Sequence, residues 1–491
     1  MSNNAVFAAA TAAFATYKIS SGETRAAFLL AVAAAIEALG DELLHTASAE
    51  SHLPLARLIG ERGRTLGQLR LFADLVADGY WAEATIDTAL PGRQPLPRPD
   101  LRRLLLPLGP VVVFGASNFP LAFSTAGGDT AAALAAGCPV VYKAHPGHPR
   151  TSALVAKAIA QAAAQCGLPA GVFQHVEGGQ EVGAELVQHP ATRAVAFTGS
   201  FGGGKALFDL AARRPVPIPV YAEMGSVNPL VILPERLAAE PTALAQQAAQ
   251  SVLLGVGQFC TNPGLLFVPA GDAATTFITE LEAALQAAAP AAMLNIGLAG
   301  NYYQHLAGVI AHPAVQALVQ PTPHKLEGRP GLARTTAAEW LQDAALQQEV
   351  FGPFTLVVTY QDAAELLAAI EALHGQLTCT LWGTAAELAH AAPLAEALRE
   401  KCGRLLFGGV PTGVEVSPAM THGGPFPATT DARSTSVGTY AIKRFARPVT
   451  FQDAPAALLP PALRNENPAG LWRVVNSELT QRSITPTSPP S

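Results

Sequence analysis

The 491-residue sequence has few cysteines, little net charge and no long apolar run, and each shortage excludes a class of protein. Its five cysteines are widely spaced, without a C-x-x-C pair or Cys/His ligand spacing, so we expect neither a disulfide framework nor a metal site. The net charge of −6 comes without a Lys/Arg cluster, which argues against a nucleic-acid partner.

Membrane and export signals are also missing. No run of about 18 apolar residues free of charged and turn residues suggests a transmembrane span. The N-terminal stretch MSNNAVFAAATAAFATYKIS lacks a basic region before its apolar part, so it predicts an amphipathic first helix and not a signal peptide. We therefore expect a soluble, cytoplasmic enzyme with no membrane partner.

Apolar residues are abundant, at 49% of the chain, and give ample material for a large core. Residues 5–85 are Ala/Leu-rich with helical spacing, and residues 86–104 are Pro-rich and predict an extended connection. From residue 105, short apolar runs alternate with Ala-rich helical stretches. This rhythm predicts an α/β fold with parallel sheets covered by helices. Residues 434–453 are expected to form two short strands, and PTSPPS at 486–491 a frayed tail.

The residues around Cys260 differ from those around the other cysteines. It lies in GVGQFCTNPG, among turn formers and polar groups, whereas Cys138, Cys166 and Cys379 lie inside apolar helix or strand patterns. A nucleophilic thiolate needs partial exposure and nearby backbone N–H donors, and such a loop offers both. From the residues alone, a nucleophile and an inert thiol are equally good interpretations.

Three further stretches place polar residues beside expected strand ends. Glu223, in YAEMGSVNP, is either a surface charge or a general base with a raised pKa. Asn118, in GASNFP, is either a turn residue or an amide donor to an oxyanion. Gly199 and Gly204 bracket a turn into a helix, in AFTGSFGGGKAL, where a helix N-terminus favours phosphate although the stretch is not a P-loop.

The order of these motifs resembles that of the aldehyde dehydrogenase superfamily over nearly the whole chain. GASNFP, VYKAHP, FTGS, AEMGSVNP, GQFCTNPG and EVFGP follow one another, and Glu223 and Cys260 lie 260 − 223 = 37 positions apart, similar to the family's spacing. GASNFPLAFSTAGGDTAAALAAGCPVVYKAHPGHPRTS and HGGPFPATTDARSTSVGTYAIKRFARPV look like the bacterial 2,5-dioxovalerate (α-ketoglutaric semialdehyde) dehydrogenases. That subgroup is similar to the fatty aldehyde dehydrogenase of luminous bacteria.

The resemblance implies the aldehyde dehydrogenase fold. We expect a Rossmann-like NAD(P)-binding domain in residues 1–224, a catalytic α/β domain in residues 225–420, and a return segment in residues 421–491. Strands from 86–104 and from the return segment would form an oligomerisation arm, which implies a homodimer or homotetramer.

The resemblance also implies roles for four residues. Cys260 matches the nucleophile, Glu223 the general base, and Asn118 the oxyanion-hole amide that acts with the Cys260 backbone N–H. His422, in MTHGGPFP, is either catalytic, as implied by a histidine of the luminous-bacterial relative, or a loop histidine with local hydrogen bonds.

Cofactor contacts follow in the same way. The residues implied are Lys143, His145, His148, Gly199, Ser200, Gly204, Glu349 and Phe351. Many NAD-preferring relatives carry a glutamate three residues after the strand-end lysine, where this chain has Pro146. Without that carboxylate a 2′-phosphate is acceptable, so we predict that NADP is preferred and NAD possible, with Arg150 as a further candidate contact.

The implied reaction oxidises an aldehyde to a carboxylic acid through a thioester on Cys260. Three interpretations stay open: an α-ketoglutaric semialdehyde dehydrogenase, an enzyme for fatty or other aliphatic aldehydes, and a catalytically silent binding protein. A CoA-acylating enzyme is disfavoured, because a base such as Glu223 implies water as the acyl acceptor. The sequence does not identify a carboxylate-binding arginine; the candidates are Arg62, Arg64, Arg70 and Arg433.

Overall fold

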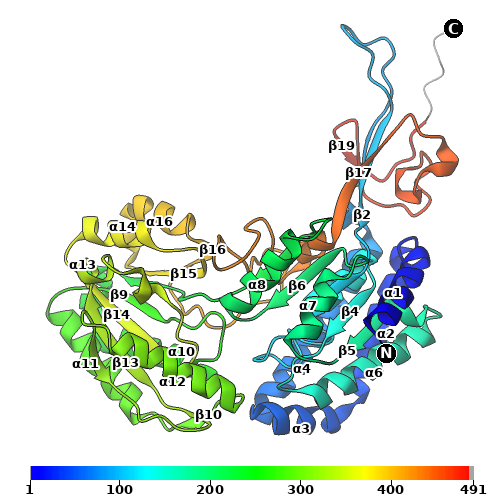
Figure 1. Cartoon of the computed structure of the whole chain (residues 1–491). Helices are drawn as coiled ribbons and strands as arrows, with labels where there is room; N and C mark the ends of the chain where they lie inside the picture. Colours follow the sequence, from blue (N-terminus) through cyan, green and yellow to red (C-terminus); the bar gives the residue numbers. More distant parts are fainter. Residues whose placement is uncertain (1, 486–491) are drawn as a thin grey trace.

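Three β-sheets organise the chain, and helices cover two of them (Figure 1). A computed structural model describes residues 2–485. The Pro-rich stretch at 486–491, expected to fray, lies outside these residues. No helix within residues 2–485 is both long enough and apolar enough to span a bilayer.

The Ala/Leu-rich N-terminal region forms helices, as its spacing predicts. Ser2 and Ser21 cap the first two helices through their side-chain oxygens, which accept the N–H groups of Ala5 and Thr24. The helices are α1 (Asn3–Tyr17), α2 (Gly22–Ala38), α3 (Gly40–Ser51) and α4 (Leu55–Asp78). Helix α4 contributes side chains to the site described below.

The first sheet is parallel and has the strand order β5-β4-β3-β6-β7. Its strands are β3 (Val111–Phe114), β4 (Val140–Lys143), β5 (Phe173–Val176), β6 (Ala194–Thr198) and β7 (Val220–Glu223). Its connecting helices are α5 (Gly128–Ala136), α6 (Pro149–Gln165), α7 (Gln180–Gln188) and α8 (Phe201–Ala212). Val111 and Val113 pack into one core and Val112 into another, because helices cover both faces. The strand order reverses at β3, where such sheets bind ligands beyond their carboxyl ends.

The second sheet has the order β11-β13-β14-β9-β8-β15-β16 and is parallel except for its edge strand β11. Its strands are β8 (Leu230–Ile232), β9 (Leu265–Pro269), β11 (Gln316–Val319), β13 (Gly331–Thr336), β14 (Phe354–Tyr360), β15 (Gln376–Trp382) and β16 (Cys402–Phe407). Its helices are α9 (Pro234–Ala239), α10 (Pro241–Leu253), α11 (Asp272–Ala287), α12 (Ile296–Ile310), α13 (Ala337–Trp340), α14 (Ala363–Ala372), α15 (Ala385–His390) and α16 (Ala392–Arg399). A small ribbon pairs β10 (Ala291–Ala292) with β12 (Glu327–Gly328).

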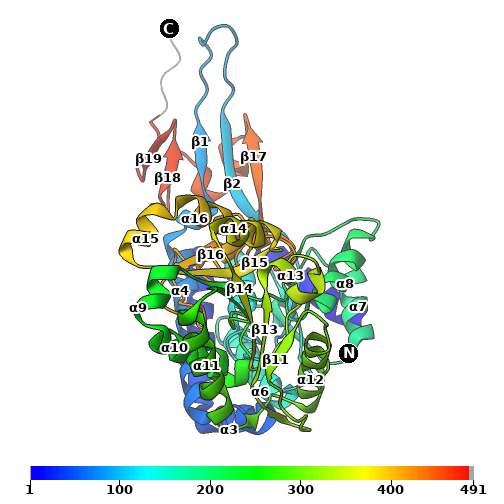
Figure 2. The same ribbon diagram turned by 90° about the vertical axis from the view of Figure 1, so that its left-hand side faces the viewer.

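The third sheet projects from the molecule as an arm (Figure 2). It contains β1 (Thr85–Asp87), β2 (Leu101–Pro107), β17 (Ala446–Gln452), β18 (Arg473–Val475) and β19 (Glu478–Thr480). The Pro-rich segment between β1 and β2 extends beyond it as a long hairpin, consistent with the extended connection expected there.

One local prediction is wrong. Residues 434–453 do not form two strands, because a 3-10 helix, η5 (Thr439–Phe445), precedes the single strand β17. Ala441, Ile442 and Phe445 of η5 are buried in the core of the first sheet. Their spacing suits a helical turn, which places these three side chains on one face.

Candidate active site

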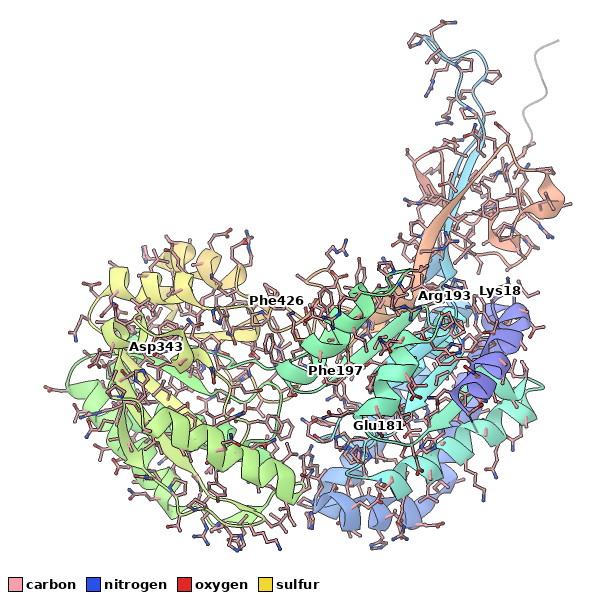
Figure 3. All side chains as sticks on the ribbon, in the orientation of Figure 1. Lys18, Glu181, Arg193, Phe197, Asp343 and Phe426 are labelled. Carbon is pink, nitrogen blue, oxygen red and sulfur yellow. The ribbon has the colours of Figure 1, made fainter. Side chains whose placement is uncertain are left out.

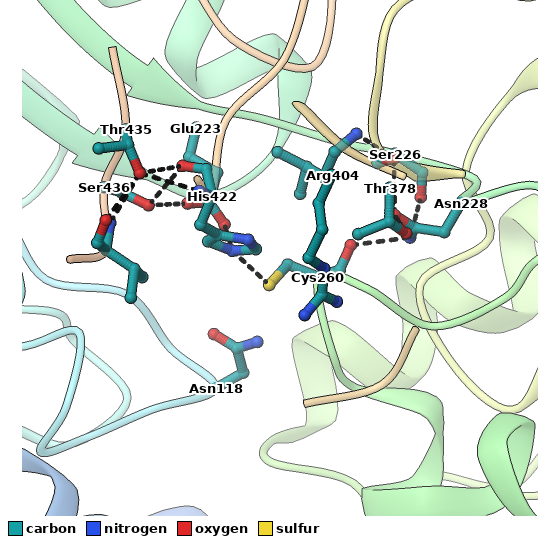
Figure 4. Close-up of polar contacts among 12 residues, drawn as sticks. Asn118, Glu223, Ser226, Asn228, Cys260, Thr378, Arg404, His422, Thr435 and Ser436 are labelled. Atoms are coloured by element: carbon teal, nitrogen blue, oxygen red, sulfur yellow. Dashed lines mark hydrogen bonds and ion pairs between the residues drawn. The ribbon is translucent and has the colours of Figure 1, made fainter. Parts of the chain in front are cut away.

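Four predicted residues converge where the two large sheets face each other. Glu223 ends β7, Asn118 follows β3, Cys260 precedes β9, and His422 comes from the return segment (Figure 4). Three of them, Asn118, Glu223 and Cys260, line one cavity of about 150 Å³. His422 contacts two of these residues directly.

A left-handed turn delivers Cys260 into the site. After α10, Gly255, Val256 and Gly257 all have positive φ, between 58° and 64°. A Cβ on Gly257 would lie 2.2 Å from the Gly352 carbonyl carbon, so only glycine fits this close approach. Val256 is a β-branched residue held in a conformation that such residues rarely adopt, which indicates that the surrounding structure fixes this turn.

A buried polar cluster then holds the cysteine loop. The Asn228 side-chain amide donates to the carbonyl oxygens of Cys260 (2.8 Å) and Asn262 (2.9 Å). Its own oxygen accepts from the Thr378 hydroxyl at 2.9 Å, and Gln376 Oε1 accepts the Asn228 backbone N–H. Asn228 is fully buried, so these bonds connect the loop rigidly to the second sheet.

Hydrogen bonds to β7 place the return segment opposite the cysteine. Met224 N–H donates to the Ala428 carbonyl (2.8 Å), and Thr430 N–H donates to the Ala222 carbonyl (3.1 Å). These bonds keep the return segment beside Glu223. The His422 and Ser436 side chains extend from this segment to the Glu223 carboxylate.

Both carboxylate oxygens of Glu223 are bonded. Oε1 lies 3.0 Å from His422 Nε2, and Oε2 accepts the Ser436 hydroxyl at 2.6 Å. The same His422 nitrogen lies 3.3 Å from Cys260 Sγ (Figure 4). His422 Nε2 therefore lies within hydrogen-bond distance of both a carboxylate oxygen and a partly exposed thiol, and connects these two groups in one chain of contacts.

The two ends of this chain have opposite pKa shifts. Burial raises the pKa of Cys260 well above its usual value, the Glu223 charge adds to the increase, and the Arg64 guanidinium acts against it. For Glu223, burial also acts upward, but the charge and hydrogen bond of His422 and the Ser436 hydroxyl outweigh it. The Glu223 pKa therefore lies below the usual value, and the raised pKa considered from the sequence is wrong. The resting pair is thus a thiol beside a carboxylate.

Asn118 is oriented toward the cysteine loop. Its Nδ2 donates to the Gln258 carbonyl at 3.0 Å, and its own backbone carbonyl accepts from Arg57 Nη2 at 2.6 Å. An amide nitrogen carries two protons, so one remains for an oxyanion beside Cys260.

Four of the expected cofactor contacts line the same cavity as Cys260. They are Gly199, Ser200, Glu349 and Phe351. Ser200 caps α8, and its hydroxyl accepts the Gly203 N–H at 3.3 Å. Burial and the Glu223 charge raise the pKa of Glu349 to about 7, against the smaller opposing effect of the Ser226 N–H.

A larger hollow adjoins this cavity. It measures about 790 Å³, shares Ser200, His305 and Glu349 with the first, and also contacts Gly225 and Phe426. Phe426 lies where side chains of the two halves of the molecule face each other (Figure 3). The helix N-terminus at Ser200 and the combined space fit a nicotinamide dinucleotide, whose pyrophosphate such an N-terminus binds.

The remaining expected contacts lie outside these lining residues. Lys143 ends β4 and is largely buried, and burial lowers its pKa. His148 is buried, with Nε2 2.8 Å from the Ala116 carbonyl, and burial lowers the pKa of His145 to about 3. Gly204 allows α8 to pack on β7, because a Cβ there would lie 2.6 Å from Met224 Cγ.

Several residues of the site were not identified from the sequence. Ser436, Asn228 and Gln376 hold the reactive groups, yet none of them received a role from the sequence, although Asn228 lies in AEMGSVNP and Ser436 in the stretch that begins HGGPFP. Ser436 and Gln376 come from segments far away in sequence. No local pattern could have placed them beside Glu223 and Asn228.

Comparisons with known proteins agree with this geometry. A sequence model of the Aldehyde dehydrogenase family matches residues 2–294. The chain is 49% identical over 476 residues to an alpha-ketoglutaric semialdehyde dehydrogenase of Acinetobacter baylyi, covering 96% of this chain and 90% of that protein. It is 51% identical over 465 residues to alpha-ketoglutaric semialdehyde dehydrogenase 2 of Azospirillum brasilense, covering 94% and 89%.

Solved structures share the fold. Apo betaine aldehyde dehydrogenase of Staphylococcus aureus aligns with a TM-score of 0.76 at 19% identity, covering 92% of this chain and 88% of that chain. A glyceraldehyde-3-phosphate dehydrogenase of Methanocaldococcus jannaschii, complexed with NADP, aligns with a TM-score of 0.75 at 19% identity, covering 92% and 93%. These likenesses confirm the fold predicted from the motifs.

Proposed function

Because the chain belongs to the aldehyde dehydrogenase family, we propose that it oxidises α-ketoglutaric semialdehyde (2,5-dioxopentanoate) to 2-oxoglutarate. The observation that carries this proposal is the bonded chain of Glu223, His422 and Cys260 beside Asn118, together with the two relatives of similar length named for that semialdehyde.

Cys260 starts the reaction by forming a bond from Sγ to the aldehyde carbon. Because its pKa is raised, the thiol gives up its proton as it attacks, and His422 and Glu223 share that proton. The carbonyl oxygen becomes an oxyanion. It accepts hydrogen bonds from the free proton of Asn118 Nδ2 and from the Cys260 N–H, for which no backbone acceptor is found within residues 2–485.

Conversion of this adduct into a thioester requires a hydride acceptor, which a nicotinamide bound in this cavity would supply. Ser200 at the start of α8, Lys143 and Glu349 are the side chains that would hold the cofactor. The thiol proton passes to solvent, so that Glu223 is again a carboxylate. Glu223 then removes a proton from water, and the water oxygen attacks the thioester carbon. The C–S bond breaks, the acid leaves, and the Cys260 sulfur takes the proton back from Glu223, which restores the resting thiol.

Members of this family use NAD(P), and we propose that NADP is preferred here. Pro146 places no carboxylate where the 2′-phosphate would lie. His145 is neutral, since its pKa is lowered to about 3, so it offers the phosphate at most a hydrogen bond, and the positive charge comes from Lys143. A kcat/KM higher with NAD than with NADP would overturn this preference.

We also propose that the arm joins copies of this chain into a dimer or tetramer, and that the domain boundaries lie near residues 224 and 420. An arm of paired strands offers an edge to which a partner's sheet can add. Mass measurement in solution tests the assembly: removal of the hairpin at residues 88–100 should yield monomers.

The test of the activity is reduction of NADP and NAD with a panel of aldehydes. The panel contains α-ketoglutaric, succinic and glutaric semialdehydes and decanal, with Cys260→Ala as the inactive control. Highest kcat/KM with α-ketoglutaric semialdehyde, lost in the control, supports the proposal. A preference for decanal would move the substrate to fatty aldehydes, and no turnover at all would favour a silent relative.

A further inference from the structure

Two arginines of α4 lie against aromatic side chains next to the cysteine loop. Arg57 and Arg64 are two turns apart and therefore share one face of the helix. The Arg57 guanidinium lies 4.9 Å from the Phe119 ring centroid and 4.8 Å from that of Phe259, the residue before Cys260. Aromatic rings thus orient these charges beside the cysteine loop.

Arg64 lacks a hydrogen-bonding partner within residues 2–485. Its guanidinium lies 5.3 Å from the Phe123 ring centroid, and its Nε and Nη2 are buried without a hydrogen-bond acceptor. Of the four candidate arginines, the other three are already engaged: Arg62 donates to a backbone carbonyl, and Arg70 and Arg433 form surface ion pairs. Among these four, only Arg64 has buried nitrogens that no described residue pairs.

The carboxylates near Arg64 do not accept hydrogen bonds from its buried nitrogens. Glu61 lies between the two arginines on α4, but its Oε1 accepts the backbone N–H groups of Leu121 and Ala122. Neither Glu61 nor Glu223 lies within ion-pair distance of an arginine among residues 2–485. A buried guanidinium without an acceptor is costly, so its retention points to an anion supplied from outside.

Arg64 is also close to the chemistry. The Phe123 ring on which it lies packs edge-on against His422, with centroids 6.3 Å apart. Its charge acts on Cys260, since it is the cation that opposes the rise in the thiol pKa. In 2,5-dioxopentanoate four bonds of about 1.5 Å separate the carboxylate carbon from the aldehyde carbon. The group that binds the carboxylate must therefore lie close to Cys260.

We propose that Arg64 binds the carboxylate of the aldehyde substrate and that the unpaired Nη1 of Arg57 assists it. This proposal rests on the function proposed above and specifies the substrate class as short ω-oxo acids. A guanidinium binds a carboxylate through two parallel hydrogen bonds, which a neutral aldehyde cannot form. A neutral aldehyde would leave the buried nitrogens unpaired, so selectivity arises from both effects.

The test compares a charged and a neutral aldehyde in the same variants. We would measure kcat and KM for 2,5-dioxopentanoate and for pentanal in the wild type, Arg64→Met and Arg64→Lys. Arg70→Met, an exposed position on the same helix, is the matched control. For Arg64→Met we expect kcat/KM with the semialdehyde to fall ~100-fold, mainly through KM. The kcat/KM of Arg64→Met with pentanal should be unchanged or higher than that of the wild type. Arg64→Lys should retain part of the activity that Arg64→Met loses. The Arg70→Met control should match the wild type.

The outcomes separate the two proposals. If the wild type prefers the semialdehyde and Arg64→Met loses activity equally on both aldehydes, the Arg64 proposal fails and the proposed function stands. If the wild type itself prefers pentanal, the proposed substrate fails. A binding measurement needs no turnover: 2-oxoglutarate should raise the Tm of Cys260→Ala, and this shift should vanish in Cys260→Ala/Arg64→Met. An equal shift in the double variant would also overturn the proposal.

Discussion

The two walls of the active site treat their polar groups differently. On the wall formed by β7 and the return segment, both oxygens of Glu223 are bonded, one to His422 and one to Ser436. On the wall formed by α4, two nitrogens of Arg64 are buried and bonded to none of the described residues. On the first wall the carboxylate of Glu223 is fully paired before substrate arrives, as a preorganised group requires. The second is completed only by a ligand.

Removal of the Glu223 carboxylate, on the wall formed by β7 and the return segment, should cause the largest loss of activity. In Glu223→Gln we expect the steady-state rate to fall ~10³-fold, because the amide cannot take a proton from water. The readout is NADPH formation over many turnovers. Glu371→Gln, at an exposed position of α14, is the matched control. A loss of less than about tenfold would contradict the assigned role.

Replacement of His422 should make the site more dependent on pH. Because the Cys260 pKa is raised, the thiolate fraction grows about tenfold per pH unit up to that pKa. In His422→Asn we expect kcat/KM to fall ~50-fold at pH 7 and much less at pH 9, where hydroxide supplies the thiolate directly.

The rate of Cys260 alkylation by iodoacetamide gives an independent readout for this variant. It should rise with pH in both proteins and be slower at pH 7 in His422→Asn. An equal loss of activity at every pH, or a loss of only a few-fold, would instead indicate a local structural role for His422.

Loss of the Ser436 hydroxyl, which donates to Glu223, should have a smaller effect on activity. That hydroxyl helps to keep the Glu223 pKa low, so Ser436→Ala should raise it and protonate the carboxyl over a wider acidic range. We expect kcat to fall ~5-fold near pH 5 and to approach the wild-type value in alkaline solution. Ser434→Ala, whose hydroxyl donates to the Asp431 carbonyl, is the control. A uniform decrease at all pH values would argue against this role.

The smallest effect is expected at Glu349, on the pH dependence of the KM for the cofactor. With a pKa of about 7, its carboxyl is mostly protonated at pH 6 and mostly ionised at pH 8. The ionised form accepts stronger hydrogen bonds than the protonated form, so the KM for the cofactor should fall several-fold between these pH values. Glu349→Gln should remove this dependence; a variant that keeps it would assign the titration to another group.

The sequence predicts the catalytic wall better than the α4 wall. Cys260, Glu223 and Asn118 each lie in a short motif at a strand end, so local pattern and resemblance locate them, although their roles stay predictions. Arg64 was one of four equal candidates, because whether a guanidinium finds an acceptor depends on residues distant in the chain. The same holds for Ser436, which reaches Glu223 from the return segment.

The fold divides in a similar way. Most of the buried parallel strands are continuous apolar runs, the pattern that predicts parallel sheets from residue 105 onward. Strand β13 was not expected, because Arg334 and two threonines interrupt its apolar pattern. Edge strand β11 was not expected, since it has only four residues and none of them is buried, which gives a weak signal. Helix η5 was mistaken for a strand because Thr439, Tyr440 and Ile442 favour strands locally, whereas packing against α5 determines its conformation.

The contact at Gly257 has a further consequence. Its backbone lies directly against that of Gly352, and the Asn262 side chain donates to the Gly352 carbonyl at 3.3 Å. Gly352 belongs to the EVFGP loop that carries Glu349, so main-chain contact sets the spacing between the cysteine loop and the cofactor loop. A movement of one loop therefore displaces the other, and the distance between the Cys260 sulfur and the Glu349 carboxylate is kept without a side chain having to adjust.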